Sequence, residues 1–264
     1  MRKCALITIF FSTTILLISN HQTTFGKFPI SEIEKLKQAI EFSDNQKELI
    51  PTLYTGEKAE QIKQNLEAIF VPCSIRERKR AEKNLIELVS TLKLPEKDSV
   101  DVDRTWSSPL NFKSTGSRHA IITFLHIGSG VYISLWILCE SDNGIKCFSF
   151  EGEARYCGYW QIVNDINNDA VPELIVKHHV GDYEGGVFDA VWSAIYKWDG
   201  DNYVRADNEF PDYYAREVVP QYQKILIEHQ DLNNNTDPQK HRIYQKCEYV
   251  LEKAESIAKK VKEK

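Results

Sequence analysis

In residues 28–96 the apolar positions recur at the spacing of an α-helix. A capping box at Ser31 and Glu34 precedes one apolar stripe, and a second box at Ser74 and Glu77 precedes another. Between them, a stripe over about residues 57–70 places four apolar side chains on one helical face: Ala59, Ile62, Leu66 and Ile69. The pattern therefore predicts three helices in this part of the chain.

Residues 99–212 follow a different pattern, rich in aromatic and β-branched residues and interrupted by turn signals such as Asp142-Asn143-Gly144. The strands that this pattern predicts cover residues 120–126, 131–139, 145–150, 158–163, 173–179 and 189–198, with a short strand near Tyr203. Short strands joined by tight turns predict an antiparallel sheet or a pair of sheets. Because no long helical crossover interrupts them, a doubly wound parallel sheet is excluded.

Helical periodicity returns after Pro211. One apolar stripe contains Val218, Tyr222, Ile225 and Leu226, and a second extends over residues 243–264. The chain is therefore predicted to be an α+β protein in which helices flank an antiparallel sheet. Its expected parts are a leader at residues 1–26, a helical region at 27–98, a β-rich domain at 99–212 and a C-terminal helical region at 213–264.

The first residues have the features of a secretory signal peptide. Arg2 and Lys3 precede an apolar run over residues 4–19, and no charged residue occurs from Cys4 to Gly26. The run is shorter than the about 18–20 residues that a membrane-spanning helix needs. Cleavage is expected after Gly26, the alternative being an uncleaved anchor. The mature protein is then extracytoplasmic, either periplasmic or secreted, with no membrane association beyond the leader.

Composition narrows the classes of partner. The chain is 42% hydrophobic, which is enough to build a core, and its formal net charge is −5. A nucleic-acid-binding protein needs a basic surface, so this charge argues against that class.

Cysteine positions predict one disulfide. All the cysteines except Cys4 follow the leader, so in an oxidising compartment they can pair. If Asp142-Asn143-Gly144 forms a three-residue loop, Cys139 lies directly opposite Cys147, and a cross-strand disulfide is expected there. A two-residue loop would instead place Cys139 opposite Phe148. No C-x-x-C motif occurs, so a zinc knuckle or thioredoxin-like site is not expected.

One loop carries a pattern of potential metal ligands. Asp165, Asn167 and Asp169 alternate between two apolar segments, and Glu173 opens the second segment. Oxygen-bearing side chains at alternate positions of a tight loop can converge on a hard cation such as Ca²⁺, with a further oxygen from the carbonyl of Val171. The alternative is an Asx-rich turn whose side chains bond to their own backbone.

An EF-hand does not fit this segment. Its sixth position is Ala170 rather than glycine, its twelfth is Val176 rather than glutamate, and the flanking segments are predicted strands.

Two short motifs carry a resemblance to a known protein family. The first is Asp-x-Asn-x-Asp-x-x-Pro-Glu-Leu, which begins at Asp165, and the second is Tyr-Lys-Trp-Asp-Gly at residues 196–200. Together they resemble the FG-GAP/VCBS repeat. The resemblance covers residues 160–206 and is weaker from residue 118. It implies a sheet like the blades of a β-propeller, a Ca²⁺-binding loop and an exported, non-catalytic protein. The family usually has glycine at the position of Ala170 and aspartate at that of Glu173, and the chain contains one copy of the motif.

Two further interpretations remain open. His178, His179, Asp182 and Glu184 contain the residue types of an extracytoplasmic hydrolase, although adjacent strand residues point to opposite faces and do not easily share a metal. The acidic, aromatic-rich segment 182–212 suits a glycan, a basic peptide or a cation, or else is ordinary sheet core. The leading interpretation is a non-catalytic exported module with a protein or glycan partner.

Overall fold

The computed structural model describes residues 49–89, 100–110, 118–127, 131–153, 162–180, 190–233 and 237–261. The predicted leader at residues 1–26 and the first predicted helix, which begins near Ser31, lie outside these ranges. Within them the chain combines helices with antiparallel strands, which confirms the α+β prediction.

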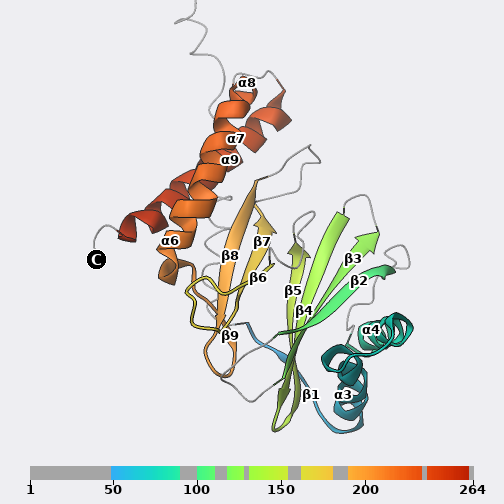
Figure 1. Ribbon diagram of the computed structural model, residues 1–264. Helices are drawn as coiled ribbons and strands as arrows, with labels where there is room; N and C mark the ends of the chain where they lie inside the picture. The colour runs from blue at the N-terminus through green and yellow to red at the C-terminus, as the bar shows by residue number, and fades with distance from the viewer. Residues whose placement is uncertain are drawn as a thin grey trace, which may run out of the picture.

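The strands of the described residues form one antiparallel arrangement with the order β2-β3-β4-β5-β7-β8-β9, in which β1 also pairs with β5 and β6 with β7 (Figure 1). Their bounds are β1 Thr52–Tyr54, β2 Val100–Leu110, β3 His119–Ile127, β4 Val131–Ser141, β5 Gly144–Glu153, β6 Val163–Asn164, β7 Glu173–His179, β8 Val191–Trp198 and β9 Tyr203–Arg205. The described strands do not close into a ring or barrel.

Two strands, β1 and β2, lie where no strand was predicted. β1 lies in the region expected to be helical, and its three residues are too few to show a period of two. β2 was not predicted, because its pattern is irregular: its pairing with β3 shifts register between Asp101 and Trp106, and it contains Pro109.

Of the predicted strand 158–163, Val163 lies in β6, Ile162 is not in a strand, and residues 158–161 lie outside the described ranges. The bounds of β7 coincide with the predicted strand 173–179.

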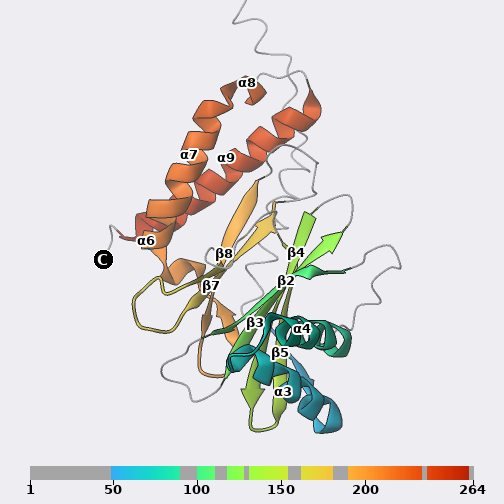
Figure 2. The same ribbon diagram turned by 45° about the vertical axis from the view of Figure 1, so that its right-hand side comes forward.

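Two helices, α3 (Gly56–Phe70) and α4 (Ile75–Val89), cover one face of β3, β4 and β5 (Figure 2). The predicted stripe of α3 is buried, as expected. The predicted capping box of α4 is formed: the N–H of Glu77 donates to Ser74 Oγ at 3.2 Å, and the N–H of Ser74 donates to Glu77 Oε2 at 3.0 Å. The apolar sheet residues beneath these helices are Ala120, Ile122, Trp136, Leu138, Ile145 and Cys147.

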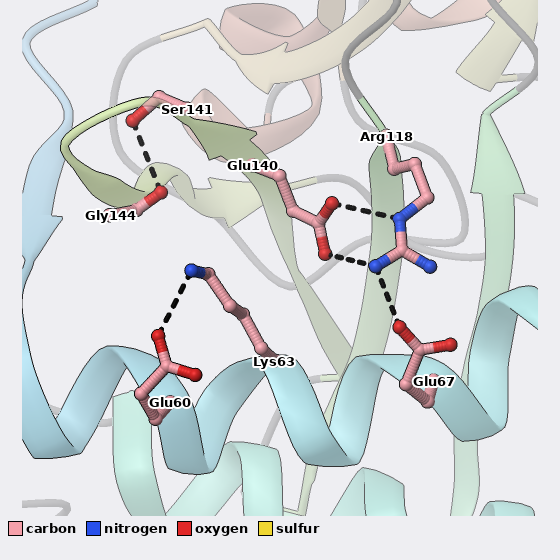
Figure 3. Close-up of polar contacts among 7 residues, drawn as sticks. All are labelled: Glu60, Lys63, Glu67, Arg118, Glu140, Ser141 and Gly144. Carbon is pink, nitrogen blue, oxygen red and sulfur yellow. Dashed lines mark hydrogen bonds and ion pairs between the residues drawn. The ribbon is translucent and has the colours of Figure 1, made fainter.

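Arg118, just before β3, connects α3 to the sheet (Figure 3). Its guanidinium donates to both carboxylate oxygens of Glu140, at 2.8 and 2.6 Å, and to Glu67 Oε1 at 2.6 Å. It also lies 4.6 Å from the ring centroid of Phe70. Because Arg118 and Glu67 are exposed, solvent screens their charges and the cluster contributes little to stability. Burial of the apolar stripe of α3 is therefore the main force that holds this helix.

The C-terminal segment is helical, as predicted, and α7 and α9 run side by side in it (Figures 1 and 2). Its elements are η1 (Asp207–Glu209), α6 (Pro211–Tyr213), the π-helical turn η2 (Tyr214–Val218), α7 (Val219–Glu228), α8 (Gln230–Asn233), α9 (Pro238–Ala258) and η3 (Lys259–Val261). Trp192 of β8 stacks on Tyr214, with ring centroids 5.2 Å apart. These helices share one core with β8 and with the second face of β4 and β5.

The segment that follows β9 closes the outer edge of β8. Tyr214 donates its hydroxyl to the carbonyl of Ser193 at 2.6 Å. The carboxylate of Asp207 accepts the N–H of Ile195 at 2.7 Å, and the N–H of Ala206 donates to the carbonyl of Ile195 at 2.8 Å. Two side chains and the N–H of Ala206 thus satisfy backbone groups that would otherwise be open to pairing with another strand.

The β4–β5 hairpin has a different register from the predicted one. Ser141 pairs with Gly144, so the loop contains two residues, Asp142 and Asn143. Gly144 has φ 137°, and a Cβ there would lie 2.1 Å from the carbonyl oxygen of Tyr54 in β1. Contact with β1 therefore requires glycine at this position and places Gly144 in the strand rather than in the loop.

This register corrects the predicted disulfide. Because the loop is Asp142-Asn143, Cys139 lies opposite Lys146, not opposite Phe148 as the two-residue alternative placed it, and Cys147 lies opposite Leu138. Cys139 belongs to the core that contains Phe148, whereas Cys147 faces the core under α3 and α4. Both are free thiols in the structure. The predicted pairing of Cys139 with Cys147 is wrong, because side chains on opposite faces of a sheet do not meet the geometry of a disulfide.

None of the helices in the described ranges combines the length and the apolar character needed to cross a bilayer.

Candidate functional site

The loop that carries the predicted calcium ligands connects β6 to β7. The two strands pair antiparallel, with Val163 opposite Leu174 and Asn164 opposite Glu173. The loop therefore closes a hairpin, and both of its ends are held by a ladder. Asp165, Asn167, Asp169 and Val171 lie in the loop, and Glu173 is the first residue of β7.

Side chains of the loop bond to its own backbone. The N–H groups of Asp169 and Ala170 donate to the two carboxylate oxygens of Asp165, each at 3.0 Å. The N–H of Val171 donates to Asp169 Oδ1 at 2.7 Å, and the amide of Asn167 donates to Asp169 Oδ2 at 2.9 Å. The Asx-rich turn expected as the alternative is therefore formed, and it brings Asp165, Asn167 and Asp169 together.

Two loop residues have left-handed backbone conformations: Asn168 with φ 60° and Ala170 with φ 67°. Asparagine adopts this region readily, whereas alanine pays roughly 1–2 kcal/mol for it. The position at which the FG-GAP/VCBS family has glycine is thus a position at which this loop needs a left-handed residue.

Glu173 is buried at the base of the loop, with 2% of its surface exposed. Its Oε2 accepts the N–H of Ile166 at 2.8 Å. Burial, together with the smaller effect of the negative charges of Asp169 and Asp165, raises the pKa of Glu173 to about 7. Three of the predicted ligands are therefore close enough for their charges to interact.

The donor set is chemically suited to a hard cation, since every predicted ligand atom is an oxygen. Within the described part of the chain, however, no three His, Cys, Asp or Glu side chains form a ready-made metal site. Both oxygens of Asp165 are turned toward N–H groups of the loop. A carboxylate offers about four lone-pair sites, so an oxygen that accepts one N–H still has a lone pair for a cation.

A second pair of reactive residue types lies inside the sheet. Cys139 Sγ is 3.1 Å from Nδ1 of His119, and both side chains are buried. Burial raises the pKa of the Cys139 thiol and lowers the pKa of His119 to about 4. Both groups are therefore neutral near pH 7, and the pair lacks the thiolate that nucleophilic catalysis by cysteine requires.

The residues of the other two interpretations are only partly described. His178 and His179 end β7, and Asp182 and Glu184 lie outside the described residues. The ring of His178 lies 6.5 Å from that of Tyr196. Of the aromatic side chains expected to rim a ligand face, Trp192 and Tyr203 are fully buried, so these two belong to the sheet core instead.

The sequence did not reveal a cavity beside the loop. This cavity is lined by charged side chains from β7 and from the start of the C-terminal helices, among them Lys177, Asp212, Arg216 and Glu217. These residues are distant along the chain, and each by itself has the sequence pattern of a solvated surface residue. No local signal could therefore have identified them as a group.

Comparison with known proteins found no matching protein family, curated protein or solved structure.

Proposed function

We propose that this protein is an exported, non-catalytic binding module whose β6–β7 loop takes up Ca²⁺. In this proposal the sheet around the loop corresponds to a single FG-GAP/VCBS-like, blade-like unit, and the helices complete its core. The observation that carries the proposal is the buried carboxyl group of Glu173, whose pKa of about 7 reflects burial and the nearby charges of Asp165 and Asp169.

A divalent cation would reduce the electrostatic repulsion among these carboxylates. Three carboxyl groups that share one loop repel one another when all are ionised, and Glu173 is additionally desolvated. A bound Ca²⁺ neutralises this charge and also accepts the carbonyl oxygen of Val171 and the side-chain oxygen of Asn167 as ligands. Binding would therefore stabilise the hairpin to which the loop belongs.

Export rests on the leader at residues 1–26, whose basic start, apolar run and uncharged end match a signal peptide. An extracellular or periplasmic location also supplies the millimolar Ca²⁺ range in which extracellular calcium modules operate. Its partner in this proposal is a protein or a glycan.

The test is thermal unfolding of the mature protein in millimolar Ca²⁺ and in EDTA. A ligand that binds only the native state adds about 2.7 kcal/mol at a hundredfold excess over Kd, so the melting temperature should rise by several degrees and EDTA should reverse the rise. The double variant Asp165→Asn with Asp169→Asn should abolish the response. Asparagine keeps an oxygen for the N–H groups of the loop but removes two charges.

A matched control removes two acidic groups elsewhere. Asp231 and Glu252 are exposed residues of α8 and α9, and their replacement by asparagine and glutamine changes the net charge by the same amount. This variant should keep the full Ca²⁺ response. A melting curve of the unaltered protein that is the same in Ca²⁺ and in EDTA would contradict the proposal and leave the loop as an Asx turn.

A further inference from the structure

A cavity of about 520 Å³ lies between the β6–β7 loop, β7 and the first helical turns after Pro211. β7 contributes Ile175 and Lys177 to its lining, and the C-terminal segment contributes Asp212, Arg216 and Glu217. Its volume falls within the range of about 300–1,000 Å³ that is typical of sites for small ligands.

Four of the five charged side chains that line this cavity are not used by the fold, the exception being Asp165, whose carboxylate accepts N–H groups of the loop. Among the residues that the structure describes, Lys177 and Arg216 form neither an ion pair nor a side-chain hydrogen bond, and the same holds for Asp212 and Glu217. Asp212 and Arg216 are four residues apart, the spacing at which opposite charges on a helix commonly pair. Two cations and two anions with available charges therefore line the cavity, beside the hydrogen-bonded carboxylate of Asp165.

The helical segment on this side of the cavity has an unusual backbone. Arg216 and Glu217 lie in the π-helical turn η2, between α6 and α7. Such turns are rare and occur frequently at functional sites. The turn is anchored from behind, because the hydroxyl of Tyr214 donates to the carbonyl of Ser193 and Val218 is buried in the core. The charged side chains are thus presented from a fixed backbone.

We propose that this cavity binds a small zwitterion, namely an amino acid or a short peptide with free ends. Lys177 and Arg216 would hold its carboxylate, and Asp212 and Glu217 its ammonium group. Charge-assisted hydrogen bonds between guanidinium and carboxylate are among the strong ones in proteins. A ligand with a single charge would leave one set of cavity charges unpaired, so the site should discriminate against it.

This inference deepens the proposed function and rests on its claim that the protein is a binding module, but not on the calcium ion. The measurement is isothermal titration of the mature protein with L-alanine and with tri-L-alanine, two arms that distinguish a free amino acid from a peptide. N-acetyl-L-alanine lacks the ammonium group, and L-alaninamide lacks the carboxylate. At least one zwitterion should bind at least tenfold more tightly than either analogue.

Variants assign the binding to the cavity. Arg216→Gln and Asp212→Asn replace exposed residues, so the fold should be retained, and each should weaken binding of the zwitterion at least tenfold. Lys224→Gln and Glu228→Gln are the matched controls, because this exposed pair lies farther along α7 and does not line the cavity. These controls should leave the affinity unchanged.

A last comparison separates the two proposals. Asp169→Asn should weaken the Ca²⁺ response without changing zwitterion affinity, because Asp169 does not line the cavity, and Arg216→Gln should do the opposite. Failure of Ca²⁺ to stabilise the protein would leave the zwitterion site standing. Three outcomes would overturn the inference. Neither zwitterion binds, or a singly charged analogue binds as tightly as the zwitterions, or Arg216→Gln and Asp212→Asn leave the binding unchanged.

Discussion

The hydroxyl group of Tyr222 makes both backbone hydrogen bonds of Val191. It donates to the carbonyl oxygen at 2.6 Å and accepts the N–H at 2.9 Å. Val191 is the first residue of β8, and Tyr222 lies in α7. One phenol therefore takes the place of a neighbouring strand at this point of the edge and attaches the C-terminal helices to the sheet.

Tyr222→Phe should lower the free energy of unfolding by about 1–3 kcal/mol, because it leaves two half-buried backbone groups of Val191 without their partner. Tyr214→Phe should have a smaller effect in the same direction, since its hydroxyl bonds to one carbonyl. Urea denaturation of the three proteins measures both differences.

Tyr203→Phe is the matched control for these variants. The hydroxyl of Tyr203 is buried and has no hydrogen-bond partner among the described residues. Its removal relieves an unsatisfied polar group, so this variant should be as stable as the unaltered protein or more stable. A loss of stability as large as that of Tyr222→Phe would contradict the assignment of both hydroxyl groups.

Ala170→Gly should raise the free energy of unfolding by about 1 kcal/mol even in EDTA. Ala170 has φ 67°, a region that glycine enters without the steric strain that the Cβ of alanine causes. The same gain is expected in millimolar Ca²⁺, because relief of the strain stabilises the folded loop whether or not the ion is bound. Asn168→Gly is the control: asparagine tolerates its φ of 60°, so the change should be within a few tenths of a kcal/mol. Equal effects of the two substitutions would rule out strain at Ala170.

His119 should make the protein less stable as the pH falls from 6.5 to 4. Burial lowers its pKa from 6.5 to about 4 in the folded state, so between these values the unfolded chain binds a proton that the folded chain does not. The contribution of His119 to the free energy of unfolding is fully present above pH 6.5 and is lost as the pH falls to about 4. The loss amounts to roughly 3 kcal/mol. Urea denaturation at several pH values should show a smaller loss for His119→Phe.

Glu173 changes the pH dependence of stability in the opposite direction to His119. Its folded pKa is raised from 4.5 to about 7, so the folded chain binds the extra proton, and this contribution is present below pH 4.5 and lost as the pH rises through 7. Glu173→Gln should therefore steepen the loss of stability on acidification, whereas His119→Phe should reduce it. The same pH dependence in both variants would contradict the two assignments.

The guanidinium of Arg205 and the carboxylate of Asp207 form a buried ion pair, with Nη2 2.7 Å from Oδ2. Asp207→Ala removes this carboxylate and should destabilise the protein by about 3–5 kcal/mol. The carboxylate of Asp207 also accepts Nε1 of Trp192 at 3.0 Å and the N–H of Ile195 at 2.7 Å. Asp207→Asn keeps an acceptor oxygen and should therefore reduce the free energy of unfolding by less than Asp207→Ala does. Glu209→Ala removes the exposed ion pair with Lys197 and should cost at most about 1 kcal/mol. Chemical denaturation ranks the three variants, and an equal loss for Asp207→Ala and Glu209→Ala would contradict the role of the buried pair.

Features with a short-range cause could be predicted from the sequence. The buried stripe of α3, the capping box of α4 and the bounds of β7 each follow from residues within a few positions of one another. The convergence of Asp165, Asn167 and Asp169 in one loop is of the same kind, because it depends on the spacing of short polar side chains in a turn.

Tertiary structure decided the features that depend on contacts between distant residues. The carbonyl of Tyr54 determines which residue of the β4–β5 hairpin must be glycine, and that choice sends Cys139 and Cys147 to opposite cores. The edge of β8 is closed from α7, and the cavity joins Lys177 to Arg216. Periodicity along the chain reports which face of an element is buried, but not which partner covers it. That partner is selected by packing and hydrogen bonding across the whole fold, because most buried polar groups are paired with a donor or acceptor, and that partner can be distant along the chain.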